Sequence, residues 1–191
     1  MTERSTSGFD YDPSLEDFAV SKEAYLGSRP NASYEFIATA AIVVDTKSSG
    51  GPRILLLQRA ASDSNPNKWE PPGGACDDED ESILHAAARE LREEAGLEAA
   101  HIDGAVGDPH LFVSRSGKRV CQFNFAIQVQ AENGGPTSVK LDPQEHQNFV
   151  WATEDEVKAK FAGGVDLDFT STEVERTILL AFEYFRRKTT P

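Results

Sequence analysis

The chain has 191 residues, of which 39% are hydrophobic and 27% are charged. This composition is that of an ordinary globular protein and excludes an intrinsically disordered chain. The formal net charge of −13 argues against general binding of duplex nucleic acid, which needs clustered Lys and Arg. We expect one domain over residues 1–191, with a core large enough to fold without a disulfide or a structural metal.

Three features of the sequence predict a soluble cytoplasmic protein. Cys76 and Cys121 lack any metal-ligand spacing, which favours two free thiols in a reducing compartment. The N-terminus is polar and acidic, and it has no hydrophobic segment typical of a signal peptide. The longest apolar run, at about 37–44, is too short to cross a bilayer, so we expect no membrane partner. The oligomeric state is not predicted.

The first third of the chain predicts an arm, a hairpin and a long loop. Residues 1–33 are expected to form an N-terminal arm that packs on the domain, with a short helix after Ser21. Residues 34–45 and 53–59 are rich in Ile, Leu, Val and Ala and predict the two strands of a hairpin. Residues 60–81 contain several prolines and glycines and predict a long loop, and long loops in compact domains are usually functional.

The rest of the chain mixes strands with helices. Residues 82–95 predict a helix that Gly96 ends. In residues 118–130, apolar side chains alternate with polar ones, which is typical of a strand. The other predicted elements are strands at 106–115 and 148–152, a turn at 133–136, and helices at about 154–161 and 172–187. This order predicts an α/β or α+β layered domain.

Three glutamates lie close together on the predicted helix. Glu90, Glu93 and Glu94 have the spacing i, i+3 and i+4, so their side chains converge at the border of the apolar face. Their mutual repulsion would be removed by a divalent cation, and Mg²⁺ prefers carboxylate oxygens. Arg89 lies four residues before Glu93 and can orient it. On spacing alone, a solvated acidic helix face is an equally good interpretation.

The segment 69–97 resembles the Nudix box and its lead-in. Residues 89–97 read RELREEAGL, which matches Arg-Glu-hydrophobic-x-Glu-Glu-x-Gly-hydrophobic at every fixed position. Seven residues separate Glu81 from Arg89, as in the family pattern, and residues 69–74 read WEPPGG, which is similar to the common lead-in. Between Gly74 and Glu81 this chain has six residues where the family pattern has five. A looser resemblance covers about 34–160.

The resemblance implies a fold, a reaction and a cofactor. The fold is an α/β/α sandwich with a mixed β-sheet. The reaction is hydrolysis of the diphosphate linkage in a nucleoside diphosphate joined to another group. The cofactor is Mg²⁺ or Mn²⁺, bound by Glu90, Glu93 and Glu94. Arg89 would hold one of these carboxylates in place, and Glu81 would assist from the start of the helix.

Residues outside the helix complete the expected site. Gly73 and Gly74 would allow the backbone to approach the metal-binding helix closely. Arg59, at the end of a predicted strand, would face a substrate phosphate; a surface arginine is the alternative. The general base that deprotonates water would be a carboxylate of the box or Glu145. Glu145 lies in EHQNFVW, which resembles the family's Glu-His-x-x-x-x-Trp stretch, and an exposed loop carboxylate is the alternative for it.

These observations together predict a divalent-metal-dependent Nudix-type pyrophosphohydrolase. Its substrate would be a small nucleoside diphosphate derivative, with no long nucleic acid as partner. One alternative is a non-catalytic module that senses a nucleotide or binds a protein, and the intact row of carboxylates argues against it. A transferase or isomerase on the same scaffold is a further alternative that no residue pattern supports. The N-terminal arm and residues 131–147 are candidate specificity elements.

Overall fold

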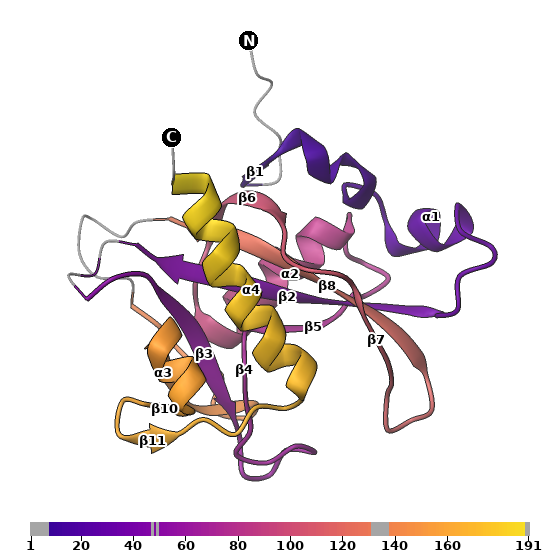
Figure 1. Cartoon of the computed structure of the whole chain (residues 1–191). Coiled ribbons are helices and arrows are strands. Elements are labelled where there is room, and N and C mark those ends of the chain that lie inside the picture. Colours follow the sequence, from indigo (N-terminus) through magenta and orange to yellow (C-terminus); the bar gives the residue numbers. More distant parts are fainter. Residues whose placement is uncertain (1–7, 47, 49, 131–137, 190–191) are drawn as a thin grey trace.

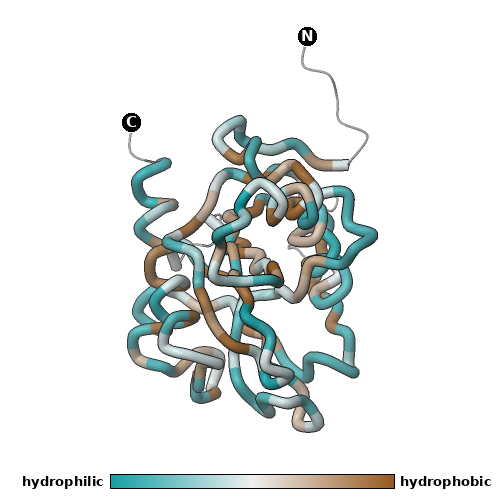
Figure 2. Tube along the Cα trace, turned by 90° about the vertical axis from the view of Figure 1, so that its right-hand side faces the viewer, coloured by the Kyte–Doolittle hydropathy of each residue, from teal (hydrophilic) through white to brown (hydrophobic). Residues whose placement is uncertain are grey.

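A mixed β-sheet forms the middle layer of the molecule, and helices cover both of its faces (Figure 1). The structure is a computed structural model and describes residues 8–46, 48, 50–130 and 138–189. One hydrophobic cluster lies on each side of the sheet. Hydrophobic residues follow the inner strands, while the peripheral loops are hydrophilic (Figure 2). The α/β/α sandwich expected from the sequence is therefore present.

The two predicted hairpin strands diverge soon after they leave their connection. β2 (Phe36–Asp45) and β3 (Arg53–Arg59) pair only at Val44–Ile54 and Asp45–Arg53. Away from the connection, β2 runs parallel to β8 (Arg119–Val129), whereas β3 runs antiparallel to β9 (His146–Thr153). This divergence opens the sheet at the ends of β2 and β3 that lie far from the connection.

The predicted long loop fills that opening with two short strands. β4 (Trp69–Glu70) pairs with β3, and β5 (Gly73–Ala75) pairs with β2. Trp69 is fully buried and anchors the segment in the core. The segment is thus tied to both diverging strands and holds its two glycines in a fixed place.

The outer strands differ from the sequence prediction. A single strand was expected at 106–115, but the structure has β6 (Ala99–Ala105) and β7 (His110–Val113), both antiparallel to β8. β6 was missed because it contains His, Asp and Gly, and two irregularities in its pairing with β8 interrupt the alternation. In β8 the predicted alternation is confirmed: Cys121, Phe123, Phe125 and Ile127 all lie in one hydrophobic cluster.

One face of the sheet carries α2 and the N-terminal arm. α2 (Ile83–Ala95) begins after Ser82 and ends at Gly96, whose φ of 66° is the left-handed conformation predicted for that glycine. The arm contains β1 (Asp10–Tyr11), η1 (Pro13–Phe18) and α1 (Lys22–Gly27), which starts after Ser21 as predicted. Phe9, Leu15 and Tyr25 of the arm are buried in the same cluster as α2.

The other face carries the C-terminal elements. These are α3 (Glu154–Ala159), β10 (Phe161–Ala162), β11 (Val165–Asp166) and α4 (Thr172–Thr189). α4 packs on the sheet through buried residues that include Ile178, Ala181 and Phe182. The turn predicted at 133–136 lies outside the described residues. Within the described ranges, no helix has the length and apolar character needed to span a membrane.

Candidate active site

The structure places the three predicted glutamates at different depths along α2. Glu94 is buried with 4% exposure, Glu90 is half-buried, and the Glu93 side chain is 52% exposed. Their carboxylates therefore meet two different environments, one dominated by Arg89 and one that includes the start of β9.

The first environment is an ion-pair network that we call the Arg89 cluster: Arg89, Asp80, Glu90 and Glu93. Arg89 Nε and Nη2 donate to the two carboxylate oxygens of Asp80, each at 2.9 Å. Arg89 Nη1 donates to Glu90 Oε1 at 2.9 Å and to Glu93 Oε2 at 3.0 Å. Burial opposes the ionisation of Asp80, but these hydrogen bonds outweigh it and hold its pKa below the ordinary value. The predicted contact between Arg89 and Glu93 is present.

Asp80, and not Glu81, is the acidic residue before α2 that accepts the hydrogen bonds donated by Arg89 Nε and Nη2. The Glu81 side chain is 78% exposed, and its Oε2 lies 3.5 Å from His85 Nε2. Asp80 has a side chain only 7% exposed and faces Arg89. The family pattern has five residues between the glycine and the first acidic residue, a spacing that Asp80 fits. It has seven residues between that acidic residue and the arginine, a spacing that Glu81 fits.

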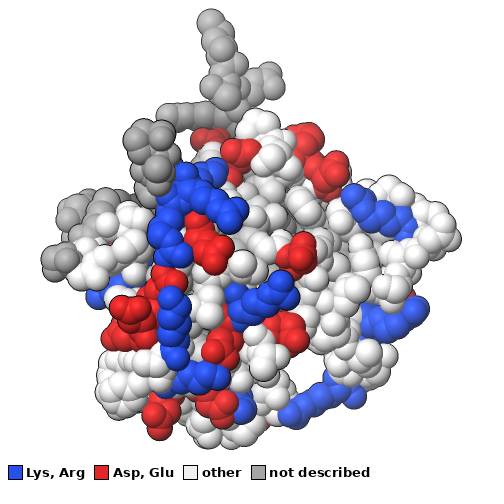
Figure 3. Space-filling model, in the orientation of Figure 1, with Lys and Arg blue, Asp and Glu red and all other residues white. Residues whose placement is uncertain are grey.

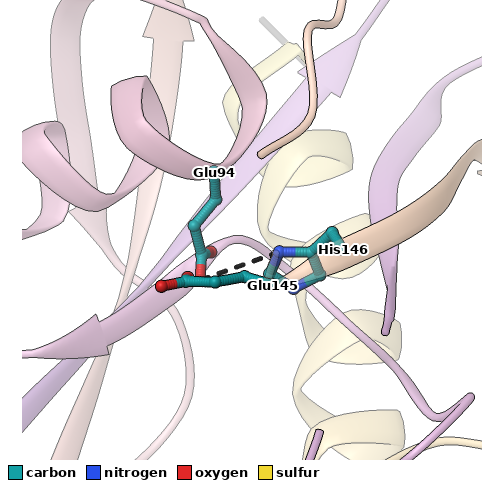
Figure 4. Close-up of side chains that lie close together, drawn as sticks. All are labelled: Glu94, Glu145 and His146. Atoms are coloured by element: carbon teal, nitrogen blue, oxygen red, sulfur yellow. Dashed lines mark ion pairs between the residues drawn. The ribbon is translucent and has the colours of Figure 1, made fainter. Parts of the chain in front are cut away.

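The second environment is the Glu94 cluster, which consists of Glu94, Glu145 and His146 (Figure 4). Glu94 reaches it from α2, and Glu145 and His146 reach it from the start of β9. Each residue offers one ligand atom within 4.8 Å of the other two. A register shift in β3 between Gln58 and Arg59 sets His146 at the point where the strand begins.

Glu94 lies in a negative environment, and its one basic neighbour among the described residues is His146, whose Nδ1 is 3.9 Å from Oε1. Burial raises its pKa to about 9, against the effect of the Gly73 N–H, which donates to Oε2 at 2.7 Å. The neighbouring carboxylates of Glu90, Glu70 and Glu145 raise the pKa further. Across the described residues, no Lys or Arg forms an ion pair with Glu94. With a pKa of about 9, this group keeps its proton at neutral pH.

The two glycines of the loop act in different ways. A Cβ at Gly73 would lie 2.2 Å from the backbone oxygen of Thr39, so only glycine fits against β2. A Cβ at Gly74 would lie 2.6 Å from Glu90 Oε1, so this position leaves room for a carboxylate. Both glycines allow a close approach: Gly73 lies against the backbone of β2, and Gly74 lies against the Glu90 side chain of α2.

Arg59 is engaged by two carboxylates. Its Nε and Nη2 donate to the two Asp63 oxygens at 2.8 and 2.7 Å, and its Nη1 donates to Glu70. Burial raises the pKa of Glu70, and Arg59 opposes that effect. Sequence reasoning missed Glu70, which is the Glu of the lead-in WEPPGG and adds a further carboxylate beside Glu94.

A cleft of about 880 Å³ opens next to this carboxylate group. Gly73, Gly74 and Arg59 line the edge nearest to α2. The far wall includes His110 and Phe112 of β7, whose ring centroids are 5.2 Å apart. Lys22 and Leu26 of the N-terminal arm also line the cleft, so the arm reaches the place expected of a specificity element.

The donor set fits a divalent cation. Glu94 is a buried carboxylate with no Lys or Arg partner in the described part of the chain, and carboxylate oxygens are the donors that hard divalent ions prefer. A buried carboxylate without compensation is costly, so such an arrangement is stable only when a proton or a cation neutralises it. Glu90, Glu94 and Glu145 therefore form an acidic centre, and Gly73 and Gly74, which line the cleft, contact Glu94 and Glu90.

The comparison with protein families agrees with this geometry. The NUDIX domain matches residues 36–171, which include strands β2 to β11, the glycine loop and α2. The chain belongs to the NUDIX domain family. The family membership and the fold predicted from the sequence are thereby confirmed.

Individual Nudix proteins are similar over most of this region. The zebrafish m7GpppN-mRNA hydrolase NUDT17 is 32% identical over 122 residues, which cover 58% of this chain and 40% of that protein. The Escherichia coli CTP pyrophosphohydrolase is 35% identical over 104 residues, which cover 54% of this chain and 69% of that protein. A C. elegans Ap4A hydrolase structure matches with a TM-score of 0.61 and 21% identity, covering 80% of this chain and 99% of that chain. The prediction of a Nudix-type hydrolase agrees with the two curated relatives.

Proposed function

We propose that this Nudix protein is a divalent-cation-dependent pyrophosphohydrolase. It cleaves the diphosphate linkage of a nucleoside diphosphate joined to another group. The observation that carries the proposal is the buried Glu94, which faces Glu90 and Glu145 and has no Lys or Arg partner in the described residues. A helix that only needed a solvated acidic face would not bury one of its carboxylates in this way.

In this proposal, Glu90, Glu93 and Glu94 hold Mg²⁺ or Mn²⁺. When bound, a divalent cation neutralises phosphate charge and lowers the pKa of a bound water. Arg89 keeps Glu90 and Glu93 oriented through its hydrogen bonds.

Glu145 is the general base of the proposed reaction. Its side chain is exposed, so solvent reaches it, and it lies in the same cluster as Glu94. It accepts a proton from the attacking water. Glu94 is less suited to this role because it is buried and, in this proposal, binds the cation.

The cleft beside the glycines receives the nucleoside of the substrate. The aromatic wall of His110 and Phe112 can stack on a base, and Gln122 contributes an amide to the floor. Because all three Arg59 nitrogens donate to Asp63 or Glu70, we assign to Arg59 a positioning role at the phosphate end.

A small nucleotide derivative fits these surroundings better than a long nucleic acid. Of the two curated relatives, the one that this chain covers more fully is named for CTP, a small nucleotide, while the other is named for capped mRNA. On the face that carries α4, acidic and basic side chains are interspersed, so this face has no continuous basic stripe (Figure 3). The two cysteines are free and buried, which supports the cytoplasmic location that we include in the proposal.

Hydrolysis assays with Mg²⁺ or Mn²⁺ test the proposal. We would screen CTP, ADP-ribose and dinucleoside polyphosphates with the wild type and with Glu94→Gln. The expected result is turnover by the wild type and a loss of about 1000-fold in Glu94→Gln. Glu98→Gln, at an exposed position just after α2, is the matched control and should keep full activity. Full activity of Glu94→Gln, or activity in excess chelator, would refute the proposal; tight nucleotide binding without any turnover would favour the non-catalytic module.

A further inference from the structure

His146 has no role in the function proposed so far, yet it is one of the most buried polar residues. Its exposure is 2%, and neither ring nitrogen has a hydrogen-bond partner among the described residues. Buried polar atoms are nearly always paired, because each unpaired donor or acceptor costs about 1–3 kcal/mol. Among the described residues, no backbone group or side chain supplies that partner, which leaves solution as its source.

The imidazole is directed at the acidic centre. Its Nδ1 lies 3.9 Å from Glu94 Oε1, and Glu145 completes a group whose ligand atoms are all within 4.8 Å of one another (Figure 4). A distance of 3.9 Å is too long for a hydrogen bond. Two donors that each lie about 2.0–2.2 Å from one ion are separated by roughly 3–4.4 Å, so the observed spacing suits two ligands of the same cation.

We propose that His146 is a nitrogen ligand of the divalent cation, beside the carboxylate of Glu94. The inference rests on the proposed function, since it needs a cation at this site. Imidazole suits first-row transition ions, whereas Mg²⁺ selects oxygen donors and waters. A mixed set of carboxylate oxygens and one imidazole nitrogen therefore gives this site a preference for a transition-metal dication over Mg²⁺.

The wild-type protein alone can test the ligand assignment. Mn²⁺ is added to the full chain, and pulsed electron paramagnetic resonance measures the coupling between the ion and nearby ¹⁴N nuclei. We expect an imidazole nitrogen coupling in the wild type and its loss in His146→Gln with Mn²⁺ still bound. His101→Gln, at a partly exposed histidine on β6, is the matched control and should keep the coupling.

Competition between Mn²⁺ and Mg²⁺ tests the selectivity. Removing His146 is expected to weaken Mn²⁺ binding by about 10-fold or more and Mg²⁺ binding much less, so that the ratio of the two dissociation constants falls. An unchanged ratio contradicts the proposal.

The outcomes separate this inference from the proposed function. If Mn²⁺ binds, depends on Glu94, and shows no nitrogen coupling in the wild type, the role of His146 is wrong and the hydrolase proposal stands. If Mn²⁺ does not bind, or binds equally well to Glu94→Gln, the proposed function itself is wrong. The wild-type spectrum decides the first question even if His146→Gln fails to fold.

Discussion

Asp80 and Glu94 are two carboxylates buried to a similar extent at opposite ends of the site, with side chains 7% and 5% exposed. Burial opposes the charged form of both. The pKa of Asp80 is nevertheless lowered, because Arg89 donates two hydrogen bonds to it. The pKa of Glu94 is raised to about 9, because its neighbours are carboxylates and a histidine.

The two clusters differ in whether a basic side chain of the protein neutralises their carboxylates. The Arg89 cluster carries its own cation and holds the loop before α2 in place. The Glu94 cluster has no such cation in the described residues, so its charge is balanced only by a proton or by an ion from solution. We therefore expect the loss of Arg89 to change mainly stability, and the loss of the Glu94 carboxylate to change cation binding together with the pH dependence of stability.

The largest expected loss of stability follows the removal of the arginine. Arg89→Met leaves Asp80 buried without a basic partner, which should lower the free energy of unfolding by about 3–5 kcal/mol. Arg92→Met, at an exposed position on the same helix, should change it by no more than about 0.5 kcal/mol. Denaturant unfolding measures both. If the two variants lose the same stability, the Arg89 cluster is not structural.

Glu94→Gln should raise the free energy of unfolding, whereas Arg89→Met should lower it. Because the folded pKa of Glu94 is raised, its neutral form is favoured by folding, and the wild type loses stability as the pH rises from about 4.5 to about 9 in the presence of a chelator. Gln removes this loss, so at pH 8 the variant should be more stable than the wild type by about 4–5 kcal/mol. Thermal or denaturant unfolding with chelator measures the difference. A variant less stable than the wild type at pH 8 would contradict the environment described for Glu94.

Because His146 is buried, we expect the protein to lose stability as the pH falls below neutral. Burial, with the nearby Arg59 charge, lowers its pKa to about 4, so between the ordinary value of 6.5 and about 4 the unfolded chain binds the proton more readily. Stability should fall by about 3 kcal/mol as the pH drops from 7 to 4, in addition to the loss from carboxylates. The pH dependence of unfolding for wild type and His146→Gln isolates this contribution. Parallel curves would show that the imidazole titrates normally.

Alanine substitutions at the two adjacent glycines should have the smallest effects, and the two variants should differ in which property they change. Gly73→Ala places a Cβ 2.2 Å from the Thr39 backbone oxygen and should lower stability by about 1–3 kcal/mol. Gly74→Ala meets only the end of the Glu90 side chain, which can move, so stability should change by less than about 1 kcal/mol while Mn²⁺ affinity falls. Calorimetric titration and denaturant unfolding of both variants test this. Equal cation affinity in Gly74→Ala and the wild type would show that Glu90 is not a ligand.

The sequence predicted the parts of the site that local spacing determines. The i, i+3, i+4 glutamates, the helix end at Gly96 and the close approach of Gly73 and Gly74 all follow from helix geometry or from the size of glycine. What the sequence did not predict depends on contacts between distant segments. His146 comes next to Glu94 only because β9 pairs with β3 across a register shift, and the partner of Arg89 depends on the path of the loop before α2.

In the outer part of the fold, too, the sequence did not predict an element that depends on contacts between distant segments. β2, β3 and β8 carry strong apolar signals and were predicted, whereas β6 contains polar residues and glycine and was not. Its strand conformation comes from pairing with β8 on one side and β1 on the other. Tertiary pairing, rather than the local pattern, determines that element.

The most direct test of the account is the number of protons released when Mn²⁺ binds at pH 7.5. Isothermal titration calorimetry in buffers of different ionisation enthalpy gives this number. Because the pKa of Glu94 is about 9 before the cation binds, the wild type should release about one proton per ion, and Glu94→Gln should release none. Binding of Mn²⁺ to the wild type without proton release would contradict the claim that a cation replaces the proton on Glu94.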